Sequence, residues 1–454
     1  MNLTLLKRKW LMPLMFFEFY LGLSVLLFFF GPWPWKVQNP TILATYLIAS
    51  QVFIAVGYFA AWRYVKASYR VTDGIAQAAH VKSGLKFLKY ALIIGFVMLI
   101  PTSLSRTGSF FPDIISGLIN TGQNYNENYE RLSHGNNYVF VEYLRMLLSV
   151  YLTGLFPLVV FYWSRISRLT KSYCISLILF NLAIYISVGV NKGIADIVVT
   201  LPWLIYLGVS AGILKIRINR KLLAVTLIVF FALFLQFFGN SQSQRGGGAG
   251  EFGVIDIGTG DIVIADKENL VSQFLGGNQL IIYESLSRYI GTGYYALSKA
   301  FEIESDSTYG LGNSMFLSRQ ANIIFGTDYF TNESLPGKLE SATGFGMYRL
   351  WHSIYPWLAS DFGFIGTLFI MGLLSFLFAL SWGNSLVTLS SNWVIMSFIM
   401  LIIFYYIPAN NQIFQSGEGT FSFVFLLSGI ILNRLTRGHL SVRKGQMGVQ
   451  SQNV

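Results

Sequence analysis

The sequence predicts an all-α polytopic membrane protein with about ten transmembrane helices. Hydrophobic residues make up 54% of the 454 residues and charged residues only 12%, whereas a soluble domain normally has about 25% charged residues. The mean hydropathy of +0.54 agrees with this class. The apolar residues gather in segments of roughly 20 residues, the length that a helix needs to cross the hydrocarbon core.

The apolar segments predict a single integral membrane domain, residues 1–454. The expected spans are 11–31, 41–61, 85–104, 138–163, 173–190, 197–214, 222–239, 354–381, 393–409 and 418–433. Basic residues such as Lys7, Lys82 and Arg165 concentrate in alternate short connections, so the positive-inside rule predicts that both termini are cytoplasmic. The first span lacks a signal-peptide cleavage site and is expected to remain as a helix. Residues 445–454 are expected to form a disordered cytoplasmic tail.

One long polar segment, residues 239–352, is expected to form a large extracytoplasmic loop between the seventh and eighth spans, which is a periplasmic loop if the chain belongs to the family it resembles below. Within it, residues 254–264 hold turn residues between two short apolar runs, which predicts a small hairpin. Residues 269–300 are partly apolar and predict a helix that lies on the membrane surface. Because Cys174 is the only cysteine, no disulfide within the chain can hold this loop together.

Some ionisable residues lie inside expected spans, where an unpaired charge costs at least a few kcal/mol. Glu18 is in the first span. Glu142 and Arg145 are three residues apart in the fourth span, so they share one helix face. They predict a polar cavity within the bundle or, equally, an internal ion pair that fixes the packing of the helices.

The polar segment 105–137, which follows the third span, is a candidate for sugar binding. It contains Arg106 and Asp113 and continues through a run rich in Asn and Tyr. Such side chains offer both donors and acceptors to sugar hydroxyls. An ordinary solvated loop is the alternative interpretation.

Four basic residues on the predicted outer side form a candidate pyrophosphate site. Lys192 lies in a short turn between two spans, at the depth of the lipid headgroups, and the neighbouring glycines would let an anion approach the backbone. A turn lysine that extends to the headgroups is the alternative. The long loop adds arginines, whose planar guanidinium group suits bidentate phosphate binding: Arg288, Arg319 and Arg349.

His352 is a candidate catalytic residue, because an imidazole can take a proton from a hydroxyl near neutral pH. Asp361 and Glu340 are alternative carboxylate bases. The sequence has no Walker motif, no His-Glu-x-x-His zinc motif and no Gly-x-Ser-x-Gly elbow, so no cofactor or metal is expected. The basic residues cluster at the ends of spans, which argues against nucleic acid as a partner.

Several of these motifs resemble the Wzy-type O-antigen polymerases. They are the turn Gly189-Val190-Asn191-Lys192-Gly193, the segment Arg288-Tyr289-Ile290-Gly291, and His352 followed by residues 358–366, which enter the eighth span. The set of spans and the large outer loop are similar as well. Related enzymes often have Ser-Arg-Gly at the turn. Asn-Lys-Gly keeps the positive charge but loses the bidentate fork.

The resemblance implies a GT-C-like fold and a multi-pass glycosyltransferase of the bacterial inner membrane, with its active site facing the periplasm. Its substrates would be undecaprenyl-pyrophosphate-linked oligosaccharides, and the growing chain would pass from its lipid carrier to the non-reducing end of a new unit. Lys192, Arg288 and Arg349 would hold pyrophosphate, and His352 or a carboxylate would activate the acceptor hydroxyl. Membrane lipids and a chain-length regulator, a polysaccharide co-polymerase, would be partners.

The sequence leaves three other functions open. An O-antigen ligase would carry out the same chemistry with the lipid A core as the acceptor. A lipid-linked oligosaccharide flippase would be a transporter, but transporters usually have internal repeats and short loops, and no repeat is visible here. A purely structural or receptor role is disfavoured by the charges within the spans.

Overall fold

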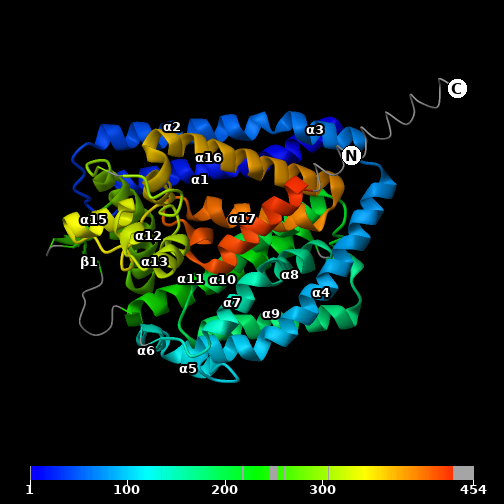
Figure 1. Ribbon diagram of the computed structural model, residues 1–454, viewed down its shortest axis with the longest axis horizontal. Helices are drawn as coiled ribbons and strands as arrows, with labels where there is room; N and C mark the ends of the chain where they lie inside the picture. The colour runs from blue at the N-terminus through cyan, green and yellow to red at the C-terminus, as the bar shows by residue number, and fades with distance from the viewer. Residues whose placement is uncertain are drawn as a thin grey trace.

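The computed structural model is almost entirely helical (Figure 1). It describes residues 2–133, 135–216, 219–245, 253–258, 261–304 and 306–432, so the predicted tail 445–454 lies outside the described residues. The elements, in chain order, are α1 (Leu3–Phe30), α2 (Pro40–Ala60), α3 (Trp62–Val71), α4 (Gly74–Thr107), α5 (Ile114–Ile119), α6 (Thr121–Ser133), α7 (Val139–Leu147), α8 (Ser149–Phe161), η1 (Trp163–Arg165), α9 (Arg168–Ser187), α10 (Lys192–Ser210), α11 (Arg220–Arg245), β1 (Val254–Asp256), β2 (Ile262–Ile264), η2 (Ser272–Phe274), α12 (Gly277–Ala300), α13 (Met315–Phe325), α14 (Tyr329–Asn332), α15 (Leu335–Thr343), α16 (Ile354–Thr388), α17 (Ser391–Tyr406), η3 (Gln412–Gln415) and a last helix, Gly417–Leu432.

Among the described residues, seven helices are long and apolar enough to cross a membrane. They are α1, α2 continued by α3, α4, α9, α10, α11 and α16. The number rises to eight if α7 and α8, which are bent by 63° relative to each other, form one broken span. α17 and the last helix are apolar but shorter. The all-α membrane class is therefore confirmed, while the count of ten spans and the GT-C-like arrangement stay predictions.

The outward faces of the spans are apolar as well. α11 is the least buried of the candidate spans, and Leu222, Ile228 and Leu233 are each more than half exposed. A contiguous apolar surface of this kind marks an interaction with a membrane or a partner. The long apolar helices therefore support a membrane-embedded protein.

The core of the bundle is α17, which lies at its centre (Figure 1) and is buried from Val394 to Phe404. A helix that is apolar all round is typical of such a position. Beside it, α2 and α16 approach closely, because a Cβ added at Gly57 would lie only 1.9 Å from the carbonyl oxygen of Gly372. Small residues allow this close packing of membrane helices.

The long loop folds into a helical region at one end of the bundle, opposite the start of α4 (Figure 1). The hairpin is confirmed, since β1 and β2 pair antiparallel with Val254 opposite Ile264. The helix predicted within residues 269–300 is confirmed as α12, while its place on the membrane surface stays a prediction. Every residue from Gly291 to Leu297 is buried, because α12 packs against α1, α11, α15 and α16.

A break in α16 connects this helical region to the spans. Gly363 has φ of 64° and ψ of 171°, outside the helical range, and glycine adopts such a conformation most readily. Just before the break, the Asp361 carboxylate accepts hydrogen bonds from the Thr308 hydroxyl, the Gly310 N–H and both nitrogens of Asn313. The first part of α16 therefore anchors the polar segment that precedes α13.

Candidate functional site

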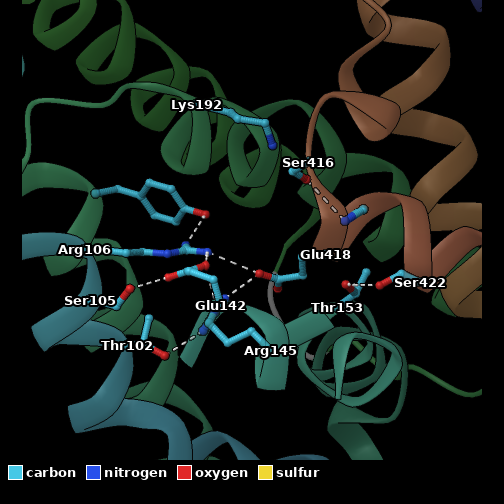
Figure 2. Close-up of polar contacts among 12 residues, drawn as sticks. Thr102, Ser105, Arg106, Glu142, Arg145, Thr153, Lys192, Ser416, Glu418 and Ser422 are labelled. Carbon is cyan, nitrogen blue, oxygen red and sulfur yellow. Dashed lines mark hydrogen bonds and ion pairs between the residues drawn. The ribbon is translucent and has the colours of Figure 1, made fainter. Parts of the chain in front are cut away.

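Four charged side chains meet inside the bundle: Arg106, Glu142, Arg145 and Glu418 (Figure 2). We call these four residues the charge cluster. Arg106 Nη2 lies 3.5 Å from Glu142 Oε2 and 3.3 Å from Glu418 Oε2. Arg145 reaches the same two oxygens, with Nε 3.8 Å from Glu142 and Nη2 2.5 Å from Glu418. Each carboxylate therefore interacts with both guanidinium groups, which compensates for the removal of these charges from water.

Helix ends bring the charge cluster together at one level of the bundle. Arg106 is in the last turn of α4, which ends where Gly108 adopts a left-handed conformation. Arg145 lies in α7, shortly before the bend between α7 and α8. Glu418 lies in the first turn of the last helix. Because these helix ends meet beside the folded long loop, the charges lie near the predicted outer face.

Arg145 is the most buried member of the charge cluster, with only 6% of its side chain exposed. Its Nη1 donates a hydrogen bond of 2.7 Å to Thr102 Oγ1. Ser105 donates a second hydrogen bond of 2.7 Å to Glu142 Oε1. Arg106 is 26% exposed. The charge cluster thus has a closed side at Arg145 and an accessible side at Arg106.

Lys192 lies beside the charge cluster, at the start of α10 (Figure 2). Its Nζ is 2.8 Å from Asp196 Oδ2, one helical turn further on. The Lys192 side chain is 39% exposed, and it is close enough to Glu418 for electrostatic attraction. Lys192 is therefore the most accessible cation of the group.

Tyr185 of α9 connects Lys192's turn to the charge cluster. Its hydroxyl accepts a hydrogen bond of 3.4 Å from Arg106 Nη1. Its ring packs against Gly193, where an added Cβ would be 2.2 Å from a ring carbon. The glycine at position 193 therefore makes room for an aromatic ring, which differs from the close anion approach that the turn predicted.

The charges around Arg106 and Lys192 suit the binding of a phosphate group. Among the described residues, the charge cluster and the Lys192–Asp196 pair bring together three cations and three carboxylates. Arginine supplies planar pairs of donors and lysine a mobile ammonium, and both bind phosphate oxygens strongly. A phosphate or pyrophosphate would compete with Glu142 and Glu418 for the same donors.

The structure brings together four residues that the sequence singled out by three separate arguments: Arg106, the pair Glu142 and Arg145, and Lys192. Sequence reasoning missed three of their partners, which are Glu418, Asp196 and Tyr185. The signal for Asp196 was its spacing of four residues from Lys192, which puts both on one helix face. The signal for Glu418 was an acidic residue at the start of an apolar segment.

Arg288 is connected to the Lys192 turn through α11. Its Nη2 lies 3.4 Å from Gln242 Oε1. The preceding residue, Ser241, accepts a hydrogen bond of 3.2 Å from Asn191 Nδ2, next to Lys192. Arg288 therefore lines the neighbouring part of the loop end, outside the charge cluster.

The other loop arginines lie on the surface. Arg349, whose side chain is 68% exposed, pairs with Asp256 of the hairpin at 3.3 Å. The guanidinium carbon of Arg319 lies 5.1 Å from the ring centre of Tyr348. Asp113 accepts a hydrogen bond from the Ser116 N–H and caps α5. The structure does not bring these three residues into the charge cluster.

His352 is enclosed by aromatic rings. It is 2% exposed, and its ring centre lies 5.0 Å from that of Phe345 and 6.3 Å from that of Trp357. Neither ring nitrogen has a hydrogen-bond partner among the described residues. Burial lowers the pKa of His352 to about 4, and the nearby backbone of Gly346 offsets this only in part. The imidazole is therefore neutral at pH 7 and shielded from solvent.

The two alternative bases also lie apart from the charge cluster. Both Asp361 oxygens accept the hydrogen bonds that anchor the segment before α13. Glu340 of α15 is exposed and accepts a hydrogen bond of 3.1 Å from the Met347 N–H. Their contacts give these carboxylates structural roles.

Two cavities lie in other parts of the molecule, and no metal-binding group marks a further site within the described residues. The described residues include no group of three or more His, Cys, Asp or Glu side chains that could hold a metal ion. One cavity of about 460 Å³ lies beside Trp33 and Trp35, and another of about 420 Å³ lies beside Lys82 and Arg165. Comparison of the chain with protein-family models, curated proteins and solved structures gave no match.

Proposed function

We propose that the chain is an O-antigen polymerase, a glycosyltransferase of the bacterial inner membrane. It would join undecaprenyl-pyrophosphate-linked oligosaccharide repeat units at the periplasmic face. The observation that carries the proposal is the convergence of Arg106, Arg145 and Lys192 at the end of the bundle that also holds the folded long loop. A lipid pyrophosphate has its anionic group at the ends of the spans and its sugars beyond them, on the side of the loop.

In the proposed mechanism, the donor pyrophosphate replaces Glu142 and Glu418 as the partner of the two arginines. Lys192, as the most accessible cation, meets the pyrophosphate first. Arg106 and Arg145 then match its remaining charge. Cations placed where negative charge develops make the pyrophosphate a better leaving group, and this stabilisation is strongest where water is excluded.

Glu418 is the proposed base once the pyrophosphate has displaced it from Arg145. Its carboxylate takes the proton of the acceptor hydroxyl, and the acceptor oxygen forms a bond to the anomeric carbon of the donor sugar. The bond from that carbon to the phosphate oxygen breaks, and the lipid pyrophosphate leaves with the electron pair. We prefer Glu418 to His352, Asp361 and Glu340 because it lies next to Arg106 and Arg145, the cations that would hold the donor.

The first experiment compares variants in a strain that lacks the gene, with lipopolysaccharide separated on a gel. Arg106→Gln and Lys192→Gln are expected to reduce the ladder to one repeat unit on the lipid core. Arg349→Gln removes an exposed arginine of the same loop end and is expected to keep the ladder. Gel filtration in detergent checks that each variant is folded. Full ladders from both Arg106→Gln and Lys192→Gln would refute the proposed site.

The deletion strain itself tests the reaction. Loss of the ladder with one repeat unit left on the lipid core supports a polymerase. Loss of all O-antigen from the core, with polymer accumulating on the carrier lipid, indicates a ligase instead. Repeat units that accumulate on the cytoplasmic side indicate a flippase. Either of the last two results would overturn the proposal.

A further inference from the structure

A groove of about 420 Å³ lies at the other end of the bundle from the charge cluster, where α4 begins and α16 ends. Its apolar lining includes Leu85 of α4, Ile213 after α10 and Leu389 after α16. Lys82 and Arg165 line it too, and both residues are exposed. The groove is therefore amphiphilic, with apolar walls and two accessible cations.

Hydrogen bonds between helices hold two lining residues of the groove, Gln77 and Leu389, in place. The Tyr162 hydroxyl, at the end of α8, donates a hydrogen bond of 2.7 Å to the Leu389 carbonyl. Gln77 of α4 donates one of 2.7 Å from its side chain to the Val387 carbonyl. These contacts tie α4 to the end of α16, and the end of α8 to the connection between α16 and α17. The groove is thus bounded by elements whose spacing is fixed.

The two cations have little compensating charge around them. In the part of the chain that the structure describes, neither Lys82 nor Arg165 forms an ion pair within 4.0 Å. Asp73, the nearest acidic residue in sequence to Lys82, caps α4 by accepting a hydrogen bond from the Ala76 N–H. The positive-inside rule accounts for basic residues at this end. It does not account for two of them lining one apolar groove.

We propose that this groove binds the headgroup of an anionic phospholipid. The phosphate lies between Lys82 and Arg165, and the first part of the acyl chains follows Leu85 and Ile213. The groove lies at the ends of several spans, where the headgroups of a bilayer lie, and basic pockets between spans suit anionic lipids. A soluble anion would leave the apolar lining exposed to water. The inference is independent of the proposed reaction.

The test measures lipid retention by the full chain purified in detergent. The protein is incubated with phosphatidylglycerol or phosphatidylcholine, and bound lipid is counted by native mass spectrometry. The double variant Lys82→Gln/Arg165→Gln is compared with Lys7→Gln/Arg8→Gln, which removes the same charges from exposed residues in the first turns of α1. Ala78→Phe fills the groove and leaves its charges unchanged.

The wild type and the Lys7→Gln/Arg8→Gln control are expected to retain phosphatidylglycerol in preference to phosphatidylcholine. The groove double variant should lower that preference roughly 30-fold, the contribution of two cations to attraction of anionic lipid. Ala78→Phe should lower it as well, and glycerol phosphate, which has no acyl chains, should not compete. Equal losses in the groove and control variants, or unchanged retention in Ala78→Phe, would overturn the proposal.

Discussion

Replacing His352 with phenylalanine should remove an acid-sensitive part of the protein's stability. The His352 ring is enclosed by Phe345 and Trp357, and its nitrogens have no hydrogen-bond partner among the described residues. Burial disfavours the charged imidazolium, so the pKa falls from 6.5 to about 4. Between these values the unfolded chain binds a proton that the folded chain does not bind. The contribution of neutral His352 to the free energy of unfolding is therefore fully present above pH 6.5, and it is lost as the pH falls through 4.

The size of the effect follows from the shift. A pKa that falls from 6.5 to about 4 corresponds to about 3 kcal/mol when both states are fully protonated. At pH 5 the imidazole is almost fully protonated in the unfolded chain but not in the folded chain. His352 should therefore lower the free energy of unfolding at pH 5 by about 2 kcal/mol relative to pH 7.5. The His352→Phe variant keeps an aromatic ring and leaves no buried nitrogen unpaired. At pH 7.5 its stability should equal that of the wild type or exceed it by ~1 kcal/mol.

The assay is unfolding of the purified protein in detergent, followed by tryptophan fluorescence, at pH values between 7.5 and 5. Other groups titrate in this range, so the quantity to compare is the difference in stability between His352→Phe and the wild type. That difference should grow in favour of the variant as the pH falls. A difference that stays constant to within about 0.5 kcal/mol, the usual size of a neutral substitution, would show that the reasoning about burial is wrong.

Two further predictions concern packing and charge. Arg145→Leu should destabilise the protein by about 3–5 kcal/mol, because it leaves Glu418 without its closest cation; adding Glu418→Leu should recover part of this loss in denaturant unfolding, and a further loss would argue against their coupling. Gly57→Ala should cost about 1–3 kcal/mol or more, because its Cβ would meet the Gly372 oxygen. It should lower the yield of monodisperse protein, whereas Gly429→Ala, with nothing within 4 Å of its Cβ, should leave the yield unchanged.

Most of the helices could be predicted from the sequence because a bilayer leaves few alternatives to a helix. The hairpin at residues 254–264 was predicted for a local reason too, since its turn residues lie between two apolar runs. The place of α12 could not be predicted in this way. Its buried run from Gly291 to Leu297 depends on the spacing of α1 and α16, which no local pattern encodes.

The candidate site could be predicted only in part. Glu142 and Arg145 were noticed because a charge within an apolar span needs a compensating partner. Arg106 was noticed in a polar segment suited to sugar hydroxyls, and Lys192 in a short turn at the depth of the lipid headgroups. These residues meet because of the way α4, α7 and α10 pack, and the spacing of residues along the chain does not encode that packing. Glu418 was missed because, as the first residue of the predicted span 418–433, it has the pattern of an ordinary residue at the end of a span.

The hydrogen bond between Ser24 of α1 and Tyr294 of α12 has a consequence for synthesis. Its two hydroxyls, 2.8 Å apart, belong to residues separated by 270 positions. At about 5–20 residues per second, roughly 14 to 54 s pass between the translation of one residue and of the other. During this interval α1 lies in the bilayer without the helix that covers it. The packing around α1 is therefore completed only when late segments arrive, and until then lipid covers the face of α1 that α12 covers in the folded chain.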